Sequence, residues 1–391
     1  VDYIGGEVSL VVSPNNYGSY TLNVNGGSWI HETFSGVTGY YTLDENPGAE
    51  RTATAIYSIA TAQPAVNGDL TYTKTVAITQ AAYGTALTKS YYSDGHRLML
   101  NSATAGYTPL NIVILGDGYK KKDLMQEGKF ERSARSAMDA FFSVEPYKSF
   151  KNRFNVYAVA YESANEGPRL ESVPSSSHST YFESYYKGGG NTYVNCSDNG
   201  KSKMKNVVQS TLGLSGDSYY RTIVIVLINT SEAVGSTDYP SMGTSSGVGD
   251  GYASFAIAML AANSTGTNGL IRHEAGGHAF GRLGDEYSVS WYTEALVNER
   301  HNVGFYRNVA TNQSYWSAFT AAGYRSDEVM YDKYGPYTTY RSTRESGIMW
   351  NNNGQFNAVS RHAIYERIIK QSQGAGAYSW NSFLEWDKKN R

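Results

Sequence analysis

The sequence predicts two domains of different fold class, a small all-β sandwich followed by a larger domain in which strands and helices alternate. In the first part, short segments alternate between Thr and apolar residues, as in residues 52–59 and 71–79. In the second part, wholly apolar runs such as Ile223–Ile228 are separated by longer amphipathic stretches. Period-two patterns with regular turns are typical of sandwiches. Strands that alternate with helices indicate an α/β layer.

Composition favours an exported protein and argues against two classes of partner. The chain of 391 residues has a net charge of -2, only 17% charged residues, 34 Tyr and 40 Gly. Because no basic face is indicated, we expect no nucleic-acid partner. No run of 18 apolar residues occurs, so we expect no transmembrane segment. We expect a secreted or cell-surface protein whose signal segment is absent from this sequence, which opens at Val1.

The single cysteine, Cys196, limits the chemistry that the chain can carry. One thiol permits neither an intrachain disulfide nor a cysteine-based zinc cluster. We expect Cys196 to be a structural or incidental thiol, and any zinc site has to be built from histidine and carboxylate side chains.

Residues 1–84 make up the predicted sandwich domain. The strands expected in it cover residues 8–12, 20–24, 52–59 and 71–79. The last hairpin, with strands in Arg51–Ile56 and Thr75–Ala81, resembles the final hairpin of BACON domains, which are immunoglobulin-like modules of exported bacterial enzymes. The resemblance implies an immunoglobulin-like sandwich with carbohydrate as a partner. The alternative is a spacer that holds the next domain away from the cell surface.

Residues 85–107 are expected to be a Tyr-, Ser- and Gly-rich linker, and the second domain is expected to cover residues 108–391. Its first strand, Asn111–Leu115, ends in Gly116-Asp117-Gly118. This motif lacks the third glycine of a dinucleotide fingerprint and the Lys of a P-loop, so we interpret it as a tight strand exit. Further elements are expected as a helix over residues 123–142 and strands over 154–160 and 223–228.

The most informative stretch runs from Gly269 to Tyr287 and carries two of the seven histidines. Its residues His273, Glu274 and His278 nearly match the pattern His-Glu-x-x-His of zinc peptidases. In that pattern two imidazoles on one helix face bind one Zn²⁺, and the glutamate between them polarises a bound water.

One additional residue separates Glu274 from His278 and changes the geometry. Residues four apart on an α-helix differ by about 40° in direction, whereas residues five apart differ by about 140°. A regular helix therefore cannot direct His273 and His278 at one ion, but a π-bulge absorbs one residue and restores a common face. We expect the bulge at Gly276-Gly277. The spacing also resembles that of the dipeptidyl-peptidase III family of zinc enzymes.

A third ligand is expected after this helix. His278-x-x-Gly281 resembles the metzincin extension, which places the third ligand six residues after the second histidine, where this chain has Gly284. The whole segment reads Gly-His-Ala-Phe-Gly-Arg-Leu-Gly-Asp-Glu-Tyr. It closely resembles the corresponding segment of the immunoglobulin A peptidase family of metzincin-like zinc proteases. The resemblance implies Asp285 as the third ligand. Glu286 is the alternative ligand, and is otherwise expected to fix a ligand or loop from behind.

A methionine turn is expected below the metal site. Residues 344–350 contain Met349 and have the form of the metzincin turn, and a helix is expected to follow over residues 360–371. Asn351 stands where many metzincins have a tyrosine, so we assign no tyrosine as oxyanion donor. The resemblance covers residues 108–372 and implies an α/β (α+β) metzincin-like zinc peptidase domain with a twisted mixed sheet.

Two further interpretations concern residues outside the motif. Residues 250–257 are a candidate edge strand that pairs with an extended substrate, and an ordinary sheet strand is the alternative. The remaining histidines have no partner at a ligand spacing, so we expect them to have surface or packing roles: His31, His96, His178, His301 and His362.

Together these patterns predict a zinc-dependent endopeptidase. His273, His278 and Asp285 would hold Zn²⁺, and Glu274 would act as general base when water attacks the scissile carbonyl. We expect an extracellular protein or glycoprotein as substrate, which the sequence does not identify further. The alternatives are a non-catalytic glycan-binding surface protein with a degenerate peptidase scaffold, and an exopeptidase.

Overall fold

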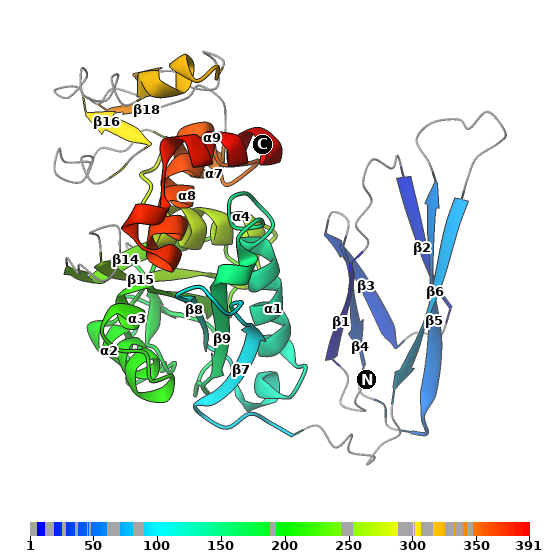
Figure 1. Cartoon of the computed structure of the whole chain (residues 1–391). Coiled ribbons are helices and arrows are strands. Elements are labelled where there is room, and N and C mark those ends of the chain that lie inside the picture. The colour runs from blue at the N-terminus through cyan, green and yellow to red at the C-terminus, as the bar shows by residue number, and fades with distance from the viewer. Residues whose placement is uncertain are drawn as a thin grey trace. The chain divides into compact units, whose positions relative to one another are not determined.

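The structure is a computed structural model. It describes residues 6–11, 19–25, 29–35, 38–44, 46, 48–60, 71–80, 90–187, 193–243, 253–287, 300, 302–305, 316–324, 332–333, 339–341 and 347–391. The chain divides into two compact units, Val1–Ser90 and Tyr91–Arg391 (Figure 1). The division lies inside the segment 85–107 that was expected to be a linker.

Strands are the only regular elements among the described residues of the first unit. They make two three-stranded antiparallel sheets, ordered β1-β4-β3 and β2-β5-β6. The strands are β1 (Gly6–Val11), β2 (Ser19–Asn25), β3 (Ile30–Ser35), β4 (Thr38–Leu43), β5 (Arg51–Ala60) and β6 (Thr71–Gln80). The paired residues Arg51 and Gln80 share a hydrogen bond of 2.7 Å, and the Arg51 guanidinium lies 4.2 Å from the centre of the buried Trp29 ring. The hydrogen bond joins the start of β5 to the end of β6, and the ring contact joins β5 to the residue that precedes β3.

The second unit is built on a six-stranded mixed sheet, ordered β14-β15-β13-β8-β9-β7. Its strands are β7 (His96–Asn101), β8 (Leu110–Asp117), β9 (Phe154–Ala160), β13 (Thr222–Ile228), β14 (Gly235–Gly243) and β15 (Ala253–Ala261). The four inner strands are parallel, and β7 and β14 pair antiparallel at the two sides. Every residue of β8 and β13 is buried, as expected for parallel strands covered on both faces. The mixed α/β fold of this part is therefore confirmed.

Two strands differ from the sequence-based expectations. Residues 96–101, which were expected to lie in the linker, form β7. This strand is partly exposed and lies in a Tyr-, Ser- and Gly-rich part of the sequence, so it shows no clear alternation of apolar residues. The candidate edge strand over residues 250–257 is wrong as an edge, because its described part belongs to β15, which lies between β14 and β13. Among the described residues, β14 is the outermost strand on that side.

Helices cover both faces of this sheet (Figure 1). Helix α1 (Lys129–Phe141) buries the apolar face that includes Phe130, Met138 and Phe141, but it begins six residues later than expected, after Glu127 in a left-handed conformation. Helix α8 (Ala358–Gln373) contains the helix expected over 360–371. The remaining helical segments are η1 (Lys121–Leu124), η2 (Lys151–Arg153), α2 (Asp198–Asn206), η3 (Val207–Thr211), α3 (Asp217–Tyr220), α4 (Thr267–Leu270), η5 (Ile271–Phe280), α7 (Ile348–Asn351), η7 (Ala375–Ala377) and α9 (Trp380–Asn390).

Two small three-stranded sheets complete the described strands. They are ordered β10-β11-β12 and β16-β18-β17. Their strands are β10 (Arg169–Leu170), β11 (Ser184–Tyr186), β12 (Val194–Cys196), β16 (Val303–Phe305), β17 (Asp332–Lys333) and β18 (Thr339–Arg341). Cys196 is buried at the end of β12, which agrees with the structural role expected for this thiol.

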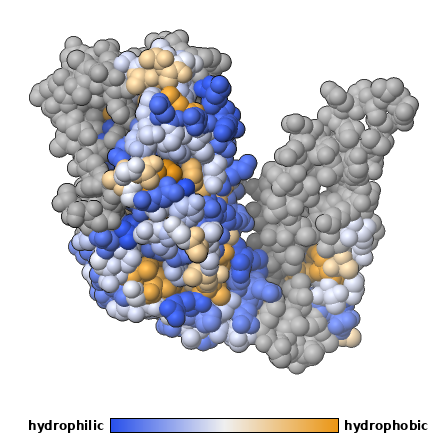
Figure 2. Space-filling model, in the orientation of Figure 1, coloured by the Kyte–Doolittle hydropathy of each residue, from blue (hydrophilic) through white to orange (hydrophobic). Residues whose placement is uncertain are grey.

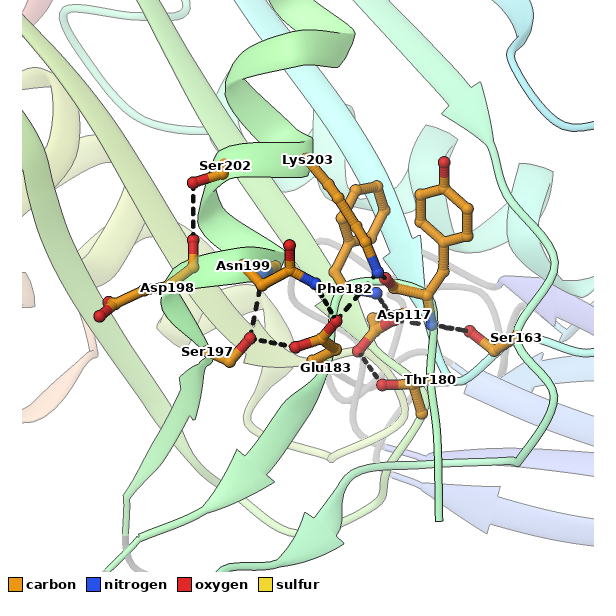
Figure 3. Close-up of polar contacts among 12 residues, drawn as sticks. Asp117, Ser163, Thr180, Phe182, Glu183, Ser197, Asp198, Asn199, Ser202 and Lys203 are labelled. Atoms are coloured by element: carbon orange, nitrogen blue, oxygen red, sulfur yellow. Dashed lines mark hydrogen bonds and ion pairs between the residues drawn. The ribbon is translucent and has the colours of Figure 1, made fainter. Parts of the chain in front are cut away.

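A buried carboxylate at the end of β8 organises the chain that covers the carboxyl ends of the parallel strands. Asp117 is fully buried and accepts hydrogen bonds from Phe182 N at 2.7 Å, Ser184 N at 3.0 Å and Thr180 Oγ1 at 2.6 Å (Figure 3). The adjacent Glu183, in a left-handed conformation, binds Lys203 Nζ at 3.0 Å. Gly116-Asp117-Gly118 is thus a strand exit, and its carboxylate binds backbone and side-chain groups of the protein.

The described surface of the second unit is mostly hydrophilic on the face seen in Figure 2, with apolar residues scattered in small groups. Among the residues that the structure describes, the exposed large apolar side chains are Tyr91, Met99, Leu170, Tyr193 and Tyr287. No helix among the described residues is both long and apolar enough to cross a membrane.

We predict that Asp117→Asn lowers the free energy of unfolding by about 2–4 kcal/mol. The amide nitrogen of asparagine cannot accept a hydrogen bond, so donors from residues 180–184 lose a charged acceptor while they stay buried. Urea denaturation followed by circular dichroism measures the effect, and the exposed Asp139→Asn is the control. Equal stability of the two variants would contradict the organising role of Asp117.

Candidate metal centre

The two histidines of the motif lie on a helix that is wound as a π-helix. Helix α4 continues directly into η5, a π-helix that spans Ile271–Phe280. Hydrogen bonds between residues five apart characterise this winding, and Gly281 N donates to Gly276 O at 2.9 Å. The expected departure from α-helical geometry is confirmed, and it extends over ten residues rather than a single bulge. It brings His273 and His278 to one face, with ring centres 4.7 Å apart.

Gly276 and Gly277 are needed where other parts of the chain approach this helix closely. A Cβ on Gly277 would lie 2.1 Å from Met349 Sδ, and a Cβ on Gly276 would lie 3.1 Å from the Tyr147 ring. The buried Tyr147 hydroxyl also donates to Gly276 O at 2.5 Å. Met349, on the short helix α7, is buried directly against the π-helix.

Asp285 completes a group of three side chains that could hold a metal ion. One ligand atom from each of His273, His278 and Asp285 lies within 4.8 Å of the others. Asp285 Oδ1 is 3.0 Å from His273 Nε2 and 3.1 Å from His278 Nε2. Donor atoms of a tetrahedral zinc site lie about 3.3 Å apart, since each is about 2.0–2.1 Å from the ion. The two separations from Asp285 are thus close to those of a tetrahedral zinc site, and this is the one group of potential metal ligands found among the described residues.

Backbone carbonyl groups orient both imidazoles. His273 Nδ1 is 2.7 Å from Ile348 O, and His278 Nδ1 is 2.8 Å from Leu283 O. Because a carbonyl oxygen only accepts, each Nδ1 carries a proton, and each Nε2 is directed at Asp285 as the ring nitrogen available to a metal ion. This arrangement of ligand and supporting acceptor is typical of histidines that bind metals.

The charges of the group are balanced without an ion. Burial opposes the charged form of His278, but the Asp285 carboxylate outweighs it and raises the pKa of His278 to about 9. Burial also opposes ionisation of Asp285, and the positive charge of His278 together with hydrogen bonds from both imidazoles still holds its pKa well below the usual range. A proton on His278 thus occupies the place that a cation would take.

The Glu286 side chain binds two asparagines and does not belong to the group that could hold a metal. Its Oε1 accepts from Asn302 Nδ2 at 2.9 Å and from Asn357 Nδ2 at 2.6 Å, and its backbone N–H donates to Met349 O at 2.8 Å. Asn302 also brackets Gly284 with two hydrogen bonds of 2.8 Å. Asn302 and Asn357 hold the loop that carries Asp285, and nothing in the motif itself points to either of them.

Glu274 lies between the histidines and is buried against strand β14. Its Oε2 accepts a hydrogen bond of 2.8 Å from Thr237 Oγ1, a residue that the sequence did not single out. On the other side of the group, Tyr287 is 41% exposed, and its ring lies nearly parallel to that of His273 at 6.3 Å. Asn351, at which no tyrosine donor was assigned, is the last residue of α7.

The described histidines outside the motif bind other groups. His31 is 3.0 Å from Asp44, His96 stacks on Tyr92, His178 bonds to Gly167 O, and the buried His362 is 2.6 Å from Tyr378 OH. None of these four belongs to a group that could hold a metal. His301 lies outside the described residues.

Comparison with known proteins gives one family. The sequence profile of the family described as IgA Peptidase M64 matches residues 99–326, which is more than half of the chain. The match contains both histidines, Glu274 and Asp285, and it ends before Met349. No curated protein matches the chain.

We predict that metal binding displaces a proton from His278. Below about pH 9 this imidazole is protonated in the metal-free protein, and above it the imidazole is neutral and free to ligate. Affinity for Zn²⁺ should therefore rise by about tenfold per pH unit up to that point, as measured by competition with a chromogenic chelator. The variant His31→Ala should show the same slope. An affinity independent of pH would contradict the prediction, and Asp285→Asn should bind far more weakly at every pH.

We also predict that Gly277→Ala weakens metal binding and stability together. The added methyl group meets Met349 Sδ, and overpacking of this kind costs about 1–3 kcal/mol. Thermal unfolding and zinc titration measure the two effects, and Gly376→Ala, where a Cβ meets nothing within 4 Å, is the control. Met349→Ala should restore part of the loss in the double variant. Additive losses would show that the two residues do not compete for the same space.

Proposed function

Because the chain belongs to the IgA peptidase M64 family, we propose that it is a zinc-dependent endopeptidase that hydrolyses peptide bonds of an extracellular protein or glycoprotein. One observation carries this proposal: His273, His278 and Asp285 converge on one point next to the buried carboxylate of Glu274. Two imidazoles, one carboxylate ligand and a neighbouring base are the parts that metal-assisted hydrolysis requires.

In the proposed mechanism, His273, His278 and Asp285 hold the zinc ion, and Glu286 fixes the loop that carries Asp285. Bound zinc supplies Lewis-acid chemistry, which acidifies water and polarises a carbonyl group. Glu274 accepts the proton of the attacking water at its carboxylate and passes it to the nitrogen of the leaving amine. Its burial beside the histidines supports this role, since it places the base close to the ligands without being one of them.

Strand β14 is the proposed place for the substrate. It pairs on one side with β15 and is the outermost described strand on the other. An extended peptide can add to such an edge through backbone hydrogen bonds. β14 also contacts the helix that carries the ligands through Thr237 and Tyr239. A peptide on this edge would lie along the metal group, which favours cleavage inside a chain.

The first unit is proposed to be a BACON-like, immunoglobulin-like sandwich over residues 1–84. Its two antiparallel sheets and the hairpin of β5 and β6 support this proposal. Carbohydrate is its proposed partner, and a role as a spacer is the alternative. Secretion or display at the cell surface follows from the composition and from the proposed substrate.

We predict that Glu274→Gln keeps the metal and loses peptidase activity by about 10²–10⁴-fold. Glutamine has the shape of glutamate but cannot accept the proton. Hydrolysis of internally quenched peptides measures the activity, and the zinc content of each variant is determined alongside. Asp139→Asn, on the exposed side of α1, is the control.

The same assay separates the alternatives. Cleavage of peptides blocked at both ends would exclude an exopeptidase. A wild-type protein without zinc or with no cleavage of any peptide would favour the non-catalytic glycan-binding scaffold. Full activity of Glu274→Gln would overturn the role of Glu274 as general base. Mass spectrometry of products from a mixed proteome, with and without a chelator, would then define the substrate class.

A further inference from the structure

Two residues of strand β14 confine the side chain of Glu274. Thr237 Oγ1 lies 2.8 Å from Glu274 Oε2 and 3.1 Å from Glu274 O. Gly235 lies against the same side chain, because a Cβ there would be 2.9 Å from Glu274 Cγ and 3.0 Å from Oε1. Residues two apart on a strand point to the same face. This face of β14 therefore shapes the space in which the carboxylate lies.

The Thr237 hydroxyl donates to the carboxylate rather than to the backbone. A hydroxyl has one proton and can donate to one acceptor at a time. The carboxylate oxygen is the closer of the two acceptors, and hydrogen bonds to a charged acceptor are the stronger kind. Oε2 is thus fixed by Thr237, and Oε1 lies beside Gly235.

Strand β14 is itself held in place by several contacts, so it can fix the position of a side chain that binds to it. It pairs with β15 over residues 235–238, including Thr237 with Ala258, and again over residues 241–243 after a register shift. Asp238 forms an ion pair of 2.6 Å with Lys201 of α2. Tyr239, on the same face as Thr237, donates from its hydroxyl to His278 O at 2.6 Å. Strand and π-helix are therefore joined at two points, one beside the base and one beside a ligand.

We propose that Thr237 is a positioning residue, whose hydroxyl holds the Glu274 carboxylate in the orientation that proton transfer requires. The inference rests on the proposed role of Glu274 as general base. A glutamate has several rotatable bonds, and catalytic groups need to be held within about 0.5 Å and 10–20° of the productive geometry. The backbone carbonyls that orient the histidines do not reach this side chain, so the strand supplies its orientation.

The test compares three variants of strand β14 in the zinc-loaded full chain. Thr237→Val has the same shape without the hydroxyl, Thr237→Ser keeps the hydroxyl, and Ser236→Ala is the control. Ser236 is buried on the opposite face of the strand, where its hydroxyl donates to Val194 O. We expect Thr237→Val to lower kcat by about 10–100-fold, since small misplacements of a reacting group cost up to about 10²-fold. KM should change by less than about twofold, and Thr237→Ser and Ser236→Ala should keep kcat close to that of the wild type.

Crystal structures of the same zinc-loaded proteins give a readout that does not depend on activity. In Thr237→Val we expect the Glu274 carboxylate to be displaced or to adopt several conformations, with zinc content and melting temperature close to those of Ser236→Ala. An unmoved carboxylate, or kcat unchanged in Thr237→Val, would overturn the inference. A fall in kcat for Thr237→Ser as large as that for Thr237→Val would also overturn it, since serine keeps the hydroxyl. If the wild type cleaves no peptide, the proposed function fails, and the position of the carboxylate still decides the role of Thr237.

Discussion

The five-residue spacing of the two histidines is the constraint on which the rest of the candidate metal centre depends. In an α-helix this spacing would turn the imidazoles about 140° apart, and π-winding of Ile271–Phe280 removes the difference. A wider helix needs partners for its carbonyl groups and side chains that fill the space around it. Tyr147 donates to Gly276 O, and Met349 packs where Gly277 has no Cβ. One inserted residue in the motif thus accounts for contacts with segments distant in the sequence.

The short segment around Met349 connects these requirements. Ile348 O accepts from His273, Met349 packs under the helix, and Met349 O accepts from the backbone of Glu286. A ligand, the helix and the loop that carries Asp285 are therefore tied to two consecutive residues. This segment therefore has a physical role beside the candidate metal group. Its backbone orients ligands, while its side chain supports the helix from below.

Local patterns in the sequence were sufficient to predict the inner strands and the departure from α-helical winding. β8 and β13 are continuous apolar runs, and the spacing of His273 and His278 rules out a regular helix. Other features depend on contacts between distant segments and have no local pattern. β7 is half exposed within a Tyr- and Ser-rich stretch, and Asn302 reaches the loop only through folding. In the sequence, Thr237 has the pattern of an ordinary strand residue, and only the fold brings it next to Glu274 on the π-helix.

The metal group is preorganised, and this determines where function is most sensitive. Burying the Asp285 carboxylate alone would be costly, but the proton on His278 balances its charge. Since the carbonyl groups of Leu283 and Ile348 also fix both rings, exchange of the proton for a cation requires little rearrangement of the ligands. Glu274 is different, because it is neither a ligand nor held by that backbone. Its orientation comes from one hydroxyl and one glycine of the strand, so the strand is where small changes should alter catalysis without altering metal binding.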